Sequence, residues 1–339
     1  MTTDLRAPER RPRWPWRCPD CGRPLAGDGP DDPGPSASDA DIGPCPACGR
    51  RFQRLEGLAD LRPLDSQTLL ERFAADYAAV RLAEGRGAIS PEDLRALPWP
   101  GPRTPMAWEW LIRSASYEAF LEAVLRPLLD LRAAPRVLDL GAGVGWLSHR
   151  LAWEGCHALA LDACAHPLVG LGAARGFLEA GSVAASEGRA APGTISLVLG
   201  DFNRVPLADA SVDLVLFNAS LHYGADLVSI LAEAERLLLP HGRIAVIDSP
   251  FYDDPAAGRA MVDAQRTALS RLGGRASDAQ DGMGFLTRRG LSSAGSIVGL
   301  RWHYVEPRRG WRWRLRRSWR RLRLGRESAD FPVALAERA

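Results

Sequence analysis

The chain has 339 residues, of which 46% are hydrophobic and 25% charged, as is typical of a folded protein with a sizeable core. Its apolar runs stay below the roughly 18 residues that a membrane-spanning helix needs. The N-terminus lacks the apolar stretch of a signal peptide, so we expect a cytoplasmic protein. All 43 basic residues are Arg, and ten of them lie within 308–326 without an acid. The net charge of +2 therefore combines an acidic body with one basic segment.

The first feature along the chain is a pair of CxxC motifs. Residues 1–17 are rich in Arg, Pro and Trp, and we expect them to be flexible. Two CxxC motifs offer four thiolates, the ligand set of a tetrahedral structural zinc with no open coordination position. The acidic Gly/Pro-rich loop 27–44 between them is predicted to be flexible. The composition thus predicts a zinc-ribbon-like module over 18–62, with the ligands Cys18, Cys21, Cys45 and Cys48.

Residues 63–130 are predicted to form a helical connector or cap. Within 65–85, apolar residues recur at helical spacing, and Asp65 or Ser66 is a suitable N-cap. A Pro-rich stretch at 96–105 interrupts the pattern, and residues 106–130 indicate one or two further helices.

From residue 131 onward, apolar strands alternate with helical stretches. Short, nearly continuous apolar runs separated by helices predict a parallel sheet covered on both faces. The fold class is therefore α/β and Rossmann-like, with a seven-stranded sheet in a domain spanning 131–339. The predicted strands are 136–141, 157–162, 195–200, 212–218, 243–249, 299–307 and 331–338.

The loop after the first of these strands, within VLDLGAGVG (137–145), indicates a ligand site. Gly141, Gly143 and Gly145 permit close approach of the backbone, and the loop leads into a helix N-terminus with free N–H groups. Dinucleotide sites use similar physics, so the glycines alone leave the ligand open. Asp139 favours a cationic ligand, because a carboxylate repels a pyrophosphate but attracts a sulfonium or ammonium group.

Polar residues after the next strands extend this site. Asp162 ends the second strand, where an acid can accept hydrogen bonds from ribose hydroxyls. Asp201 follows the third strand, where it can accept from an adenine amino group, with Phe202 beside the ring. The pattern thus predicts an adenosyl ligand that carries positive charge.

The ordered set VLDLGAGVG, LALD, GDFNRVPL, VDLVLFNASLHY and LLLPHGRIAVID resembles the class I S-adenosylmethionine-dependent methyltransferases of the small-molecule type, also called methyltransferase type 11. The resemblance is close over 130–250 and loose over 105–339. It implies S-adenosylmethionine as cofactor, with Asp162 at the ribose and Asp201 and Phe202 at the adenine. It also implies that Asn218 lies beside the methionine and the reacting methyl. The residues implied to hold the methionine end are Asp139, Gly141, Ala142, Gly143 and Gly145.

Two residues are candidates for a general base. Positioning supplies much of the rate of methyl transfer, and a base helps when the acceptor carries a proton. His222 follows the fourth strand and Asp248 follows the fifth, at the edge where the acceptor should approach. For His222 the alternative is a packing role in the pocket wall. The sequence leaves the acceptor atom open.

The acceptor itself has two interpretations. A small-molecule or lipid-like acceptor is favoured, and RNA is the alternative, because the cysteine motifs resemble the zinc ribbon that precedes some ribosomal RNA methyltransferases. The basic segment 308–326 is predicted to be a helical insertion between the last two strands, near the substrate entrance. Its apolar stripe of Trp311, Leu315, Trp319 and Leu322 leaves three roles open: contact with RNA, contact of 310–325 with an anionic membrane surface, or packing on the sheet domain.

Overall fold

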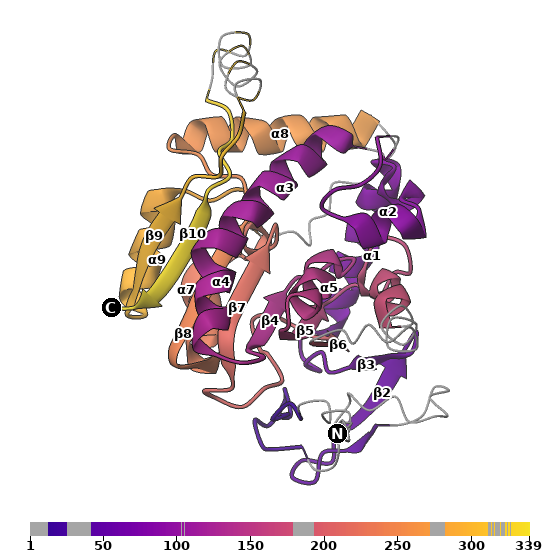
Figure 1. Cartoon of the computed structure of the whole chain (residues 1–339). Coiled ribbons are helices and arrows are strands. Elements are labelled where there is room, and N and C mark those ends of the chain that lie inside the picture. The colour runs from indigo at the N-terminus through magenta and orange to yellow at the C-terminus, as the bar shows by residue number, and fades with distance from the viewer. Residues whose placement is uncertain are drawn as a thin grey trace, which may run out of the picture.

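The structure is a computed structural model, and it describes residues 13–25, 42–102, 104, 106–178, 193–271, 282–310, 313, 315, 319, 323, 325 and 327–339. Within them the strands form a ten-stranded sheet in the order β1-β2-β3-β6-β5-β4-β7-β8-β10-β9 (Figure 1). The strands are β1 (Gly43–Pro44), β2 (Arg51–Leu55), β3 (Leu58–Asp60), β4 (Arg136–Leu140), β5 (His157–Asp162), β6 (Thr194–Leu199), β7 (Val212–Asn218), β8 (Leu238–Ile247), β9 (Leu300–Val305) and β10 (Val333–Arg338).

Seven of these strands are the ones that the sequence predicts. β6, β5, β4, β7, β8 and β9 run parallel, and β10 lies antiparallel between β8 and β9. If these seven core strands are numbered 1 to 7 in chain order, their order across the sheet is 3-2-1-4-5-7-6. The first four core strands lie within one residue of their predicted positions, because strands covered on both faces are continuous apolar runs.

Helices cover both faces of the sheet, and each face has its own hydrophobic cluster. Leu138 of β4 packs in the cluster that contains Ile230 of α7, whereas its neighbour Val137 packs with Tyr117 of α3 on the other face. The helices are α1 (Gln67–Ala83), η1 (Arg86–Ala88), α2 (Pro91–Ala96), α3 (Ala107–Phe120), the π-helix η2 (Leu121–Leu125), α4 (Arg126–Leu131), α5 (Trp146–Trp153), η3 (Leu171–Ala174), η4 (Leu221–Tyr223), α7 (Leu227–Leu237), α8 (Pro255–Arg271) and α9 (Arg288–Ile297).

The N-terminal region extends the sheet instead of forming a separate module. β2 and β3 form an antiparallel pair, and β3 pairs in parallel with β6, so this region lies at the opposite edge from β9 (Figure 1). Trp14 and Trp16 are 3% and 5% exposed and belong to the core cluster. This corrects the prediction of a flexible segment over 1–17 for residues 13–17, where two large indoles are buried. Residues 1–12, and most of the loop predicted over 27–44, lie outside the described residues.

Helices α1 to α4 occupy the predicted connector over 63–130. Ser66 is the N-cap residue of α1, but its hydroxyl makes no capping bond and instead donates to Asp201 Oδ2 (3.2 Å). The helical pattern at 106–130 corresponds to α3, η2 and α4 in direct succession. Within the described part of the chain, no helix combines the length and hydrophobicity needed to cross a bilayer.

Candidate active site

A large cavity lies over the carboxyl ends of the central strands. Its volume is about 920 Å³, and residues that follow β4, β5, β6, β7 and β8 line it. Side chains of α1, α3 and α8 form the opposite wall. In open parallel sheets this edge is where ligands bind, and the volume is within the usual range for small-molecule sites.

The glycine-rich loop forms one wall of this cavity. Gly141, Gly143 and Gly145 all have positive φ, at 72°, 55° and 71°. A Cβ on Gly141 would lie 2.5 Å from the Ser220 Cβ, so this glycine is needed for packing within the protein. A Cβ on Gly143 would meet nothing closer than the Tyr77 hydroxyl at 3.9 Å, so this glycine leaves room on the cavity side. The loop ends at the N-terminus of α5, and Ala142 also lines the cavity.

Asp162 lines the cavity and fixes the loop, whereas Asp139 lies beneath it. Asp162 Oδ2 accepts from the Gly143 N–H and Oδ1 accepts from the Cys164 N–H, both at 2.8 Å. Asp139 is fully buried and is not among the residues that line the cavity. Its Oδ2 accepts from Ser148 Oγ (2.7 Å), while Oδ1 has no hydrogen-bond partner. Burial raises the pKa of Asp139 to about 7, so a nearby cation would favour its ionised form.

Asp201, Phe202 and Asn218 complete this end of the cavity. Asp201 Oδ1 accepts from the Asn203 backbone and side-chain amides at 2.8 and 2.7 Å. Phe202 packs edge-on against Phe217, with ring centroids 6.4 Å apart. Asn218 is 7% exposed, and its Oδ1 has no hydrogen-bond partner within the protein. A buried amide oxygen without a partner at a cavity wall fits a ligand that donates a hydrogen bond.

The two candidate bases, His222 and Asp248, also line the cavity. Burial, together with Arg81 and Arg113, lowers the pKa of His222 to about 3, so the ring is neutral at pH 7 and weakly basic. Its Nδ1 lies 3.2 Å from Ser249 Oγ. Both Asp248 carboxylate oxygens are buried without a hydrogen-bond partner, and burial raises the pKa of this group. Asp248 is therefore the more basic of the two.

Sequence reasoning missed the wall formed by α3. Trp108, Ile112 and Arg113 line the cavity from this helix. Helical residues three or four positions apart lie on the same face, so one face of α3 can meet the cavity while another meets the sheet. Trp108 stacks on Trp313 with ring centroids 6.0 Å apart, and Trp313 also contacts Phe331. Trp313, which lies near the start of the basic insertion, thus lines the cavity. The position of the insertion between β9 and β10 predicts this placement. Trp311 and Leu322 of the predicted stripe lie outside the described residues.

The four cysteines of the two CxxC motifs form a cluster. Cys18 Sγ lies 3.8 Å from Cys48 Sγ, and Cys21 Sγ lies 3.7 Å from Cys45 Sγ. All four sulfurs lie within 4.8 Å of one another. Zn–S bonds of about 2.3 Å in a tetrahedron require sulfur separations of about 3.8 Å. The cluster therefore has the size and donor set for zinc.

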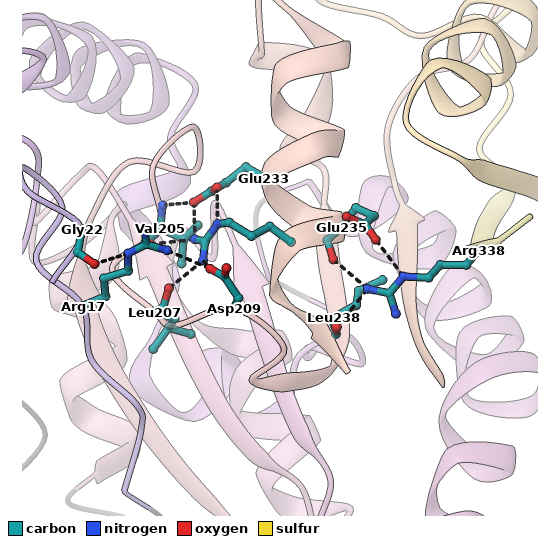
Figure 2. Close-up of polar contacts among 10 residues, drawn as sticks. Arg17, Gly22, Val205, Leu207, Asp209, Glu233, Glu235, Leu238 and Arg338 are labelled. Atoms are coloured by element: carbon teal, nitrogen blue, oxygen red, sulfur yellow. Dashed lines mark hydrogen bonds and ion pairs between the residues drawn. The ribbon is translucent and has the colours of Figure 1, made fainter. Parts of the chain in front are cut away.

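Contacts join this cluster to the loop that follows β6. Arg17 Nε donates to the Gly22 carbonyl beside Cys21, and its Nη1 donates to Asp209 at 2.8 Å (Figure 2). Arg236 Nη1 donates to the same carboxylate (2.6 Å) and to the Leu207 carbonyl. At the other end of the loop, Asp65 accepts two bonds from Arg204. The N-terminal region therefore holds the loop that begins at Asp201.

Comparison with known proteins identifies the central part of the chain. Residues 138–246 match the family model of the methyltransferase domain. This part of the chain is therefore similar to a methyltransferase domain. The chain is 36% identical over 115 residues to an uncharacterised methyltransferase of Mycobacterium tuberculosis, a match that covers 34% of this chain and 40% of that protein. It is 32% identical over 120 residues to a demethylmenaquinone methyltransferase of Beutenbergia cavernae, covering 35% and 43%.

The methyltransferase domain has further relatives. A malonyl-[acyl-carrier protein] O-methyltransferase of Methylococcus capsulatus is 36% identical over 127 residues, covering 37% of this chain and 41% of that protein. The chain thus spans about two fifths of the length of the relatives that it matches. Among solved structures, geranyl diphosphate C-methyltransferase of Streptomyces coelicolor is 17% identical with a TM-score of 0.45, covering 70% and 86%. The seven core strands form one sheet, and the N-terminal strands β3, β2 and β1 are added at one of its edges.

Proposed function

We propose that this chain is an S-adenosylmethionine-dependent methyltransferase whose acceptor is a small or lipid-like molecule. The observation that carries the proposal is a single cavity with two chemically different ends. One end has the glycine loop and the carboxylates Asp162 and Asp201, whose geometry suits an adenosyl ligand. The other end has mostly aromatic and aliphatic walls, which suit an apolar acceptor.

The residues that would hold the cofactor fit its chemistry. Asp162 would accept from the ribose, Asp201 from the adenine amino group, and Asn218 Oδ1 from the ammonium group. S-adenosylmethionine supplies an activated methyl group when bound. The chain then has to align the acceptor and exclude water, for which a cavity between the strand ends and helices α1, α3 and α8 is suited.

The relatives support a small acceptor over RNA. Two of the relatives above are named for demethylmenaquinone and for malonyl-[acyl-carrier protein], and neither name includes RNA. The RNA interpretation depended on the cysteine motifs and the basic segment. In the structure the cysteine cluster contacts the loop after β6, and most of the basic segment lies outside the described residues.

Two measurements test this function. Calorimetry should show binding of S-adenosylmethionine that weakens about 10- to 100-fold in Asp162→Ala, because at least one ribose hydrogen bond to a charged group is lost. Transfer from methyl-labelled cofactor should then be compared between a lipid and metabolite extract and total RNA from the same cells. Label found only in RNA would replace the small-molecule proposal with RNA methylation.

We also propose that the cysteine cluster binds one structural zinc. Purified chain should contain about one zinc per molecule by metal analysis. Cys18→Ser or Cys45→Ser should remove it.

A further inference from the structure

The acceptor end of the cavity contains a cation without a partner, Arg113. Arg113 projects from α3 and lines the cavity. Among the described residues it forms no hydrogen bond or ion pair, and its contact is with the face of the Trp110 ring, 5.1 Å from the centroid. Burial lowers its pKa, with Asp248 acting in the opposite direction. A guanidinium normally uses its donors when it is removed from water, so this one is available to a ligand.

Two neighbouring cations, Arg81 and Arg86, are already paired with carboxylates. Arg86 donates to Glu84 at 2.7 Å and to Glu109 at 2.9 Å. Arg81 donates to Glu84 at 2.8 Å and to the Tyr223 hydroxyl. Arg113 thus differs from Arg81 and Arg86, whose carboxylate partners are fixed.

Asp248 faces the same cavity, and neither of its carboxylate oxygens has a hydrogen-bond partner, although Ser116 and Arg309 are near enough to lower its pKa. It is 6% exposed. Arg113 is the cation that acts most strongly on Asp248, and Asp248 is the carboxylate that acts most strongly on Arg113. Within the described residues no ion pair of 4.0 Å or less joins them. A buried acceptor, Asp248, and a half-buried donor, Arg113, therefore face the same cavity without forming an ion pair with each other.

We propose that Arg113 and Asp248 form a subsite for an ionisable hydroxyl group, phenolic or enolic, on an otherwise apolar acceptor. A hydroxyl is complementary to this pair, because Asp248 can accept its proton while Arg113 donates to its oxygen. The net charge of the pair is zero, which suits a neutral acceptor better than a carboxylate or phosphate. The walls beside the pair include Trp108, Ile112, Tyr252 and Phe331, which suit an apolar body. The inference rests on the proposed methyltransferase function and specifies its acceptor class.

Asp248 and Arg113 can serve methyl transfer to such a hydroxyl group as follows. The acceptor O–H bond breaks, and its proton goes to an Asp248 oxygen. The acceptor oxygen forms a bond to the methyl carbon as the carbon–sulfur bond breaks, and that electron pair stays on sulfur. The products are a methyl ether, S-adenosylhomocysteine and a protonated Asp248. Arg113 stabilises the negative charge that develops on the acceptor oxygen before the new bond is complete.

The test uses the full-length chain and the probe 4-hexyl-2-nitrophenol, whose ionisation is seen by its visible absorbance. In native chain the Arg113 guanidinium should displace the ionisation of the bound probe to lower pH by roughly one pKa unit or more, relative to a site in which only Asp248 and the apolar walls act on the phenolate. Arg113→Met should abolish most of this displacement. Arg126→Met, at an exposed position of α4 outside the cavity, should keep it. Arg113→Lys should keep most of it, because the charge remains.

Two results would overturn the proposal. One is an equal pKa of the bound probe in native chain and Arg113→Met, and the other is failure of native chain to bind the probe at all. S-adenosylmethionine affinity, measured by calorimetry without the probe, should be unchanged in Arg113→Met and shows that the variant folds. Loss of cofactor binding in native chain would instead contradict the proposed function, so the two failures are distinguishable.

Discussion

Single buried carboxylates control the electrostatics of this site, and Asp139 gives the clearest prediction. Its pKa is about 7 in the folded chain, against an ordinary value near 3.8. The folded state therefore binds this proton more tightly than the unfolded state does, so stability falls as pH rises from about 4 to 7 and then levels off. The stability of Asp139→Asn relative to the native chain should therefore increase by roughly 3 kcal/mol between pH 5 and pH 8, because about two pH units of this titration lie above pH 5.

Urea unfolding of the apoprotein at both pH values measures this difference. A stability difference of the same size at pH 5 and pH 8 would contradict a titrating Asp139. The same variant should bind S-adenosylmethionine more weakly at pH 8, because the ionised carboxylate that favours a cationic ligand is gone.

A second prediction at this scale separates the two candidate bases. A base must be deprotonated, so activity should rise with pH through its pKa. The pKa of Asp248 is raised, whereas that of His222 is lowered to about 3. If Asp248 is the base, Asp248→Asn should lower kcat about 10²- to 10⁴-fold and remove the rising limb of the plot of kcat against pH. His222→Gln should keep the limb, and its loss in that variant would assign the base to His222 instead.

At the scale of elements, an aromatic contact joins two segments that are distant in sequence and both line the cavity. Trp313, from the insertion between β9 and β10, stacks on Trp108 of α3 and meets Phe331. Trp313→Ala should raise KM for the acceptor about two- to tenfold, the range of an aromatic pair, while cofactor affinity stays unchanged. Trp319→Ala is the matched control, because that ring is 56% exposed and contacts Arg323. Equal effects of the two substitutions would argue against a role for the stack.

Elements differ in how well local sequence predicts them. The apolar runs of β4 to β7 identify strands directly, because both sheet faces are covered and burial dominates the pattern. The pairing of β3 with β6 was not predicted, since it joins residues far apart in sequence through backbone bonds that carry no residue signature. Trp14 and Trp16 lie in a stretch whose Arg and Pro content indicates flexibility, yet long-range packing orders them.

Local sequence likewise predicts only some of the residues of the candidate site. Motif positions placed Asp162, Asp201 and Asn218 around the cavity, because ends of parallel strands meet at one edge. Arg113 could not be predicted in this way. It lies on a helix outside the motifs, in a chain where every cation is Arg, so residue type alone gave no signal.

At the scale of the whole molecule, hydrogen bonds connect the cysteine cluster to the loop after β6, which borders the proposed cofactor end of the cavity. Arg17 connects the backbone beside Cys21 to Asp209, and Ser66 donates to Asp201 at the start of the same loop. If the cluster binds zinc and this loop binds the adenine, as proposed, loss of zinc should loosen the loop. Cys45→Ser should lose the metal and bind S-adenosylmethionine about tenfold more weakly, as expected for loss of roughly one to two hydrogen bonds.

Cys156→Ser provides the control for this prediction. Cys156 is fully buried in the other hydrophobic cluster, away from the four sulfurs, so its replacement should destabilise the fold without releasing zinc. Metal content, unfolding midpoint and cofactor Kd should be measured for native chain and both variants. If the two variants are equally destabilised but only Cys45→Ser binds the cofactor weakly, the weaker binding results from loss of the contacts between the cysteine cluster and the loop after β6. Unchanged cofactor affinity in zinc-free Cys45→Ser would show that the added strands stabilise the sheet edge without supporting the adenine loop.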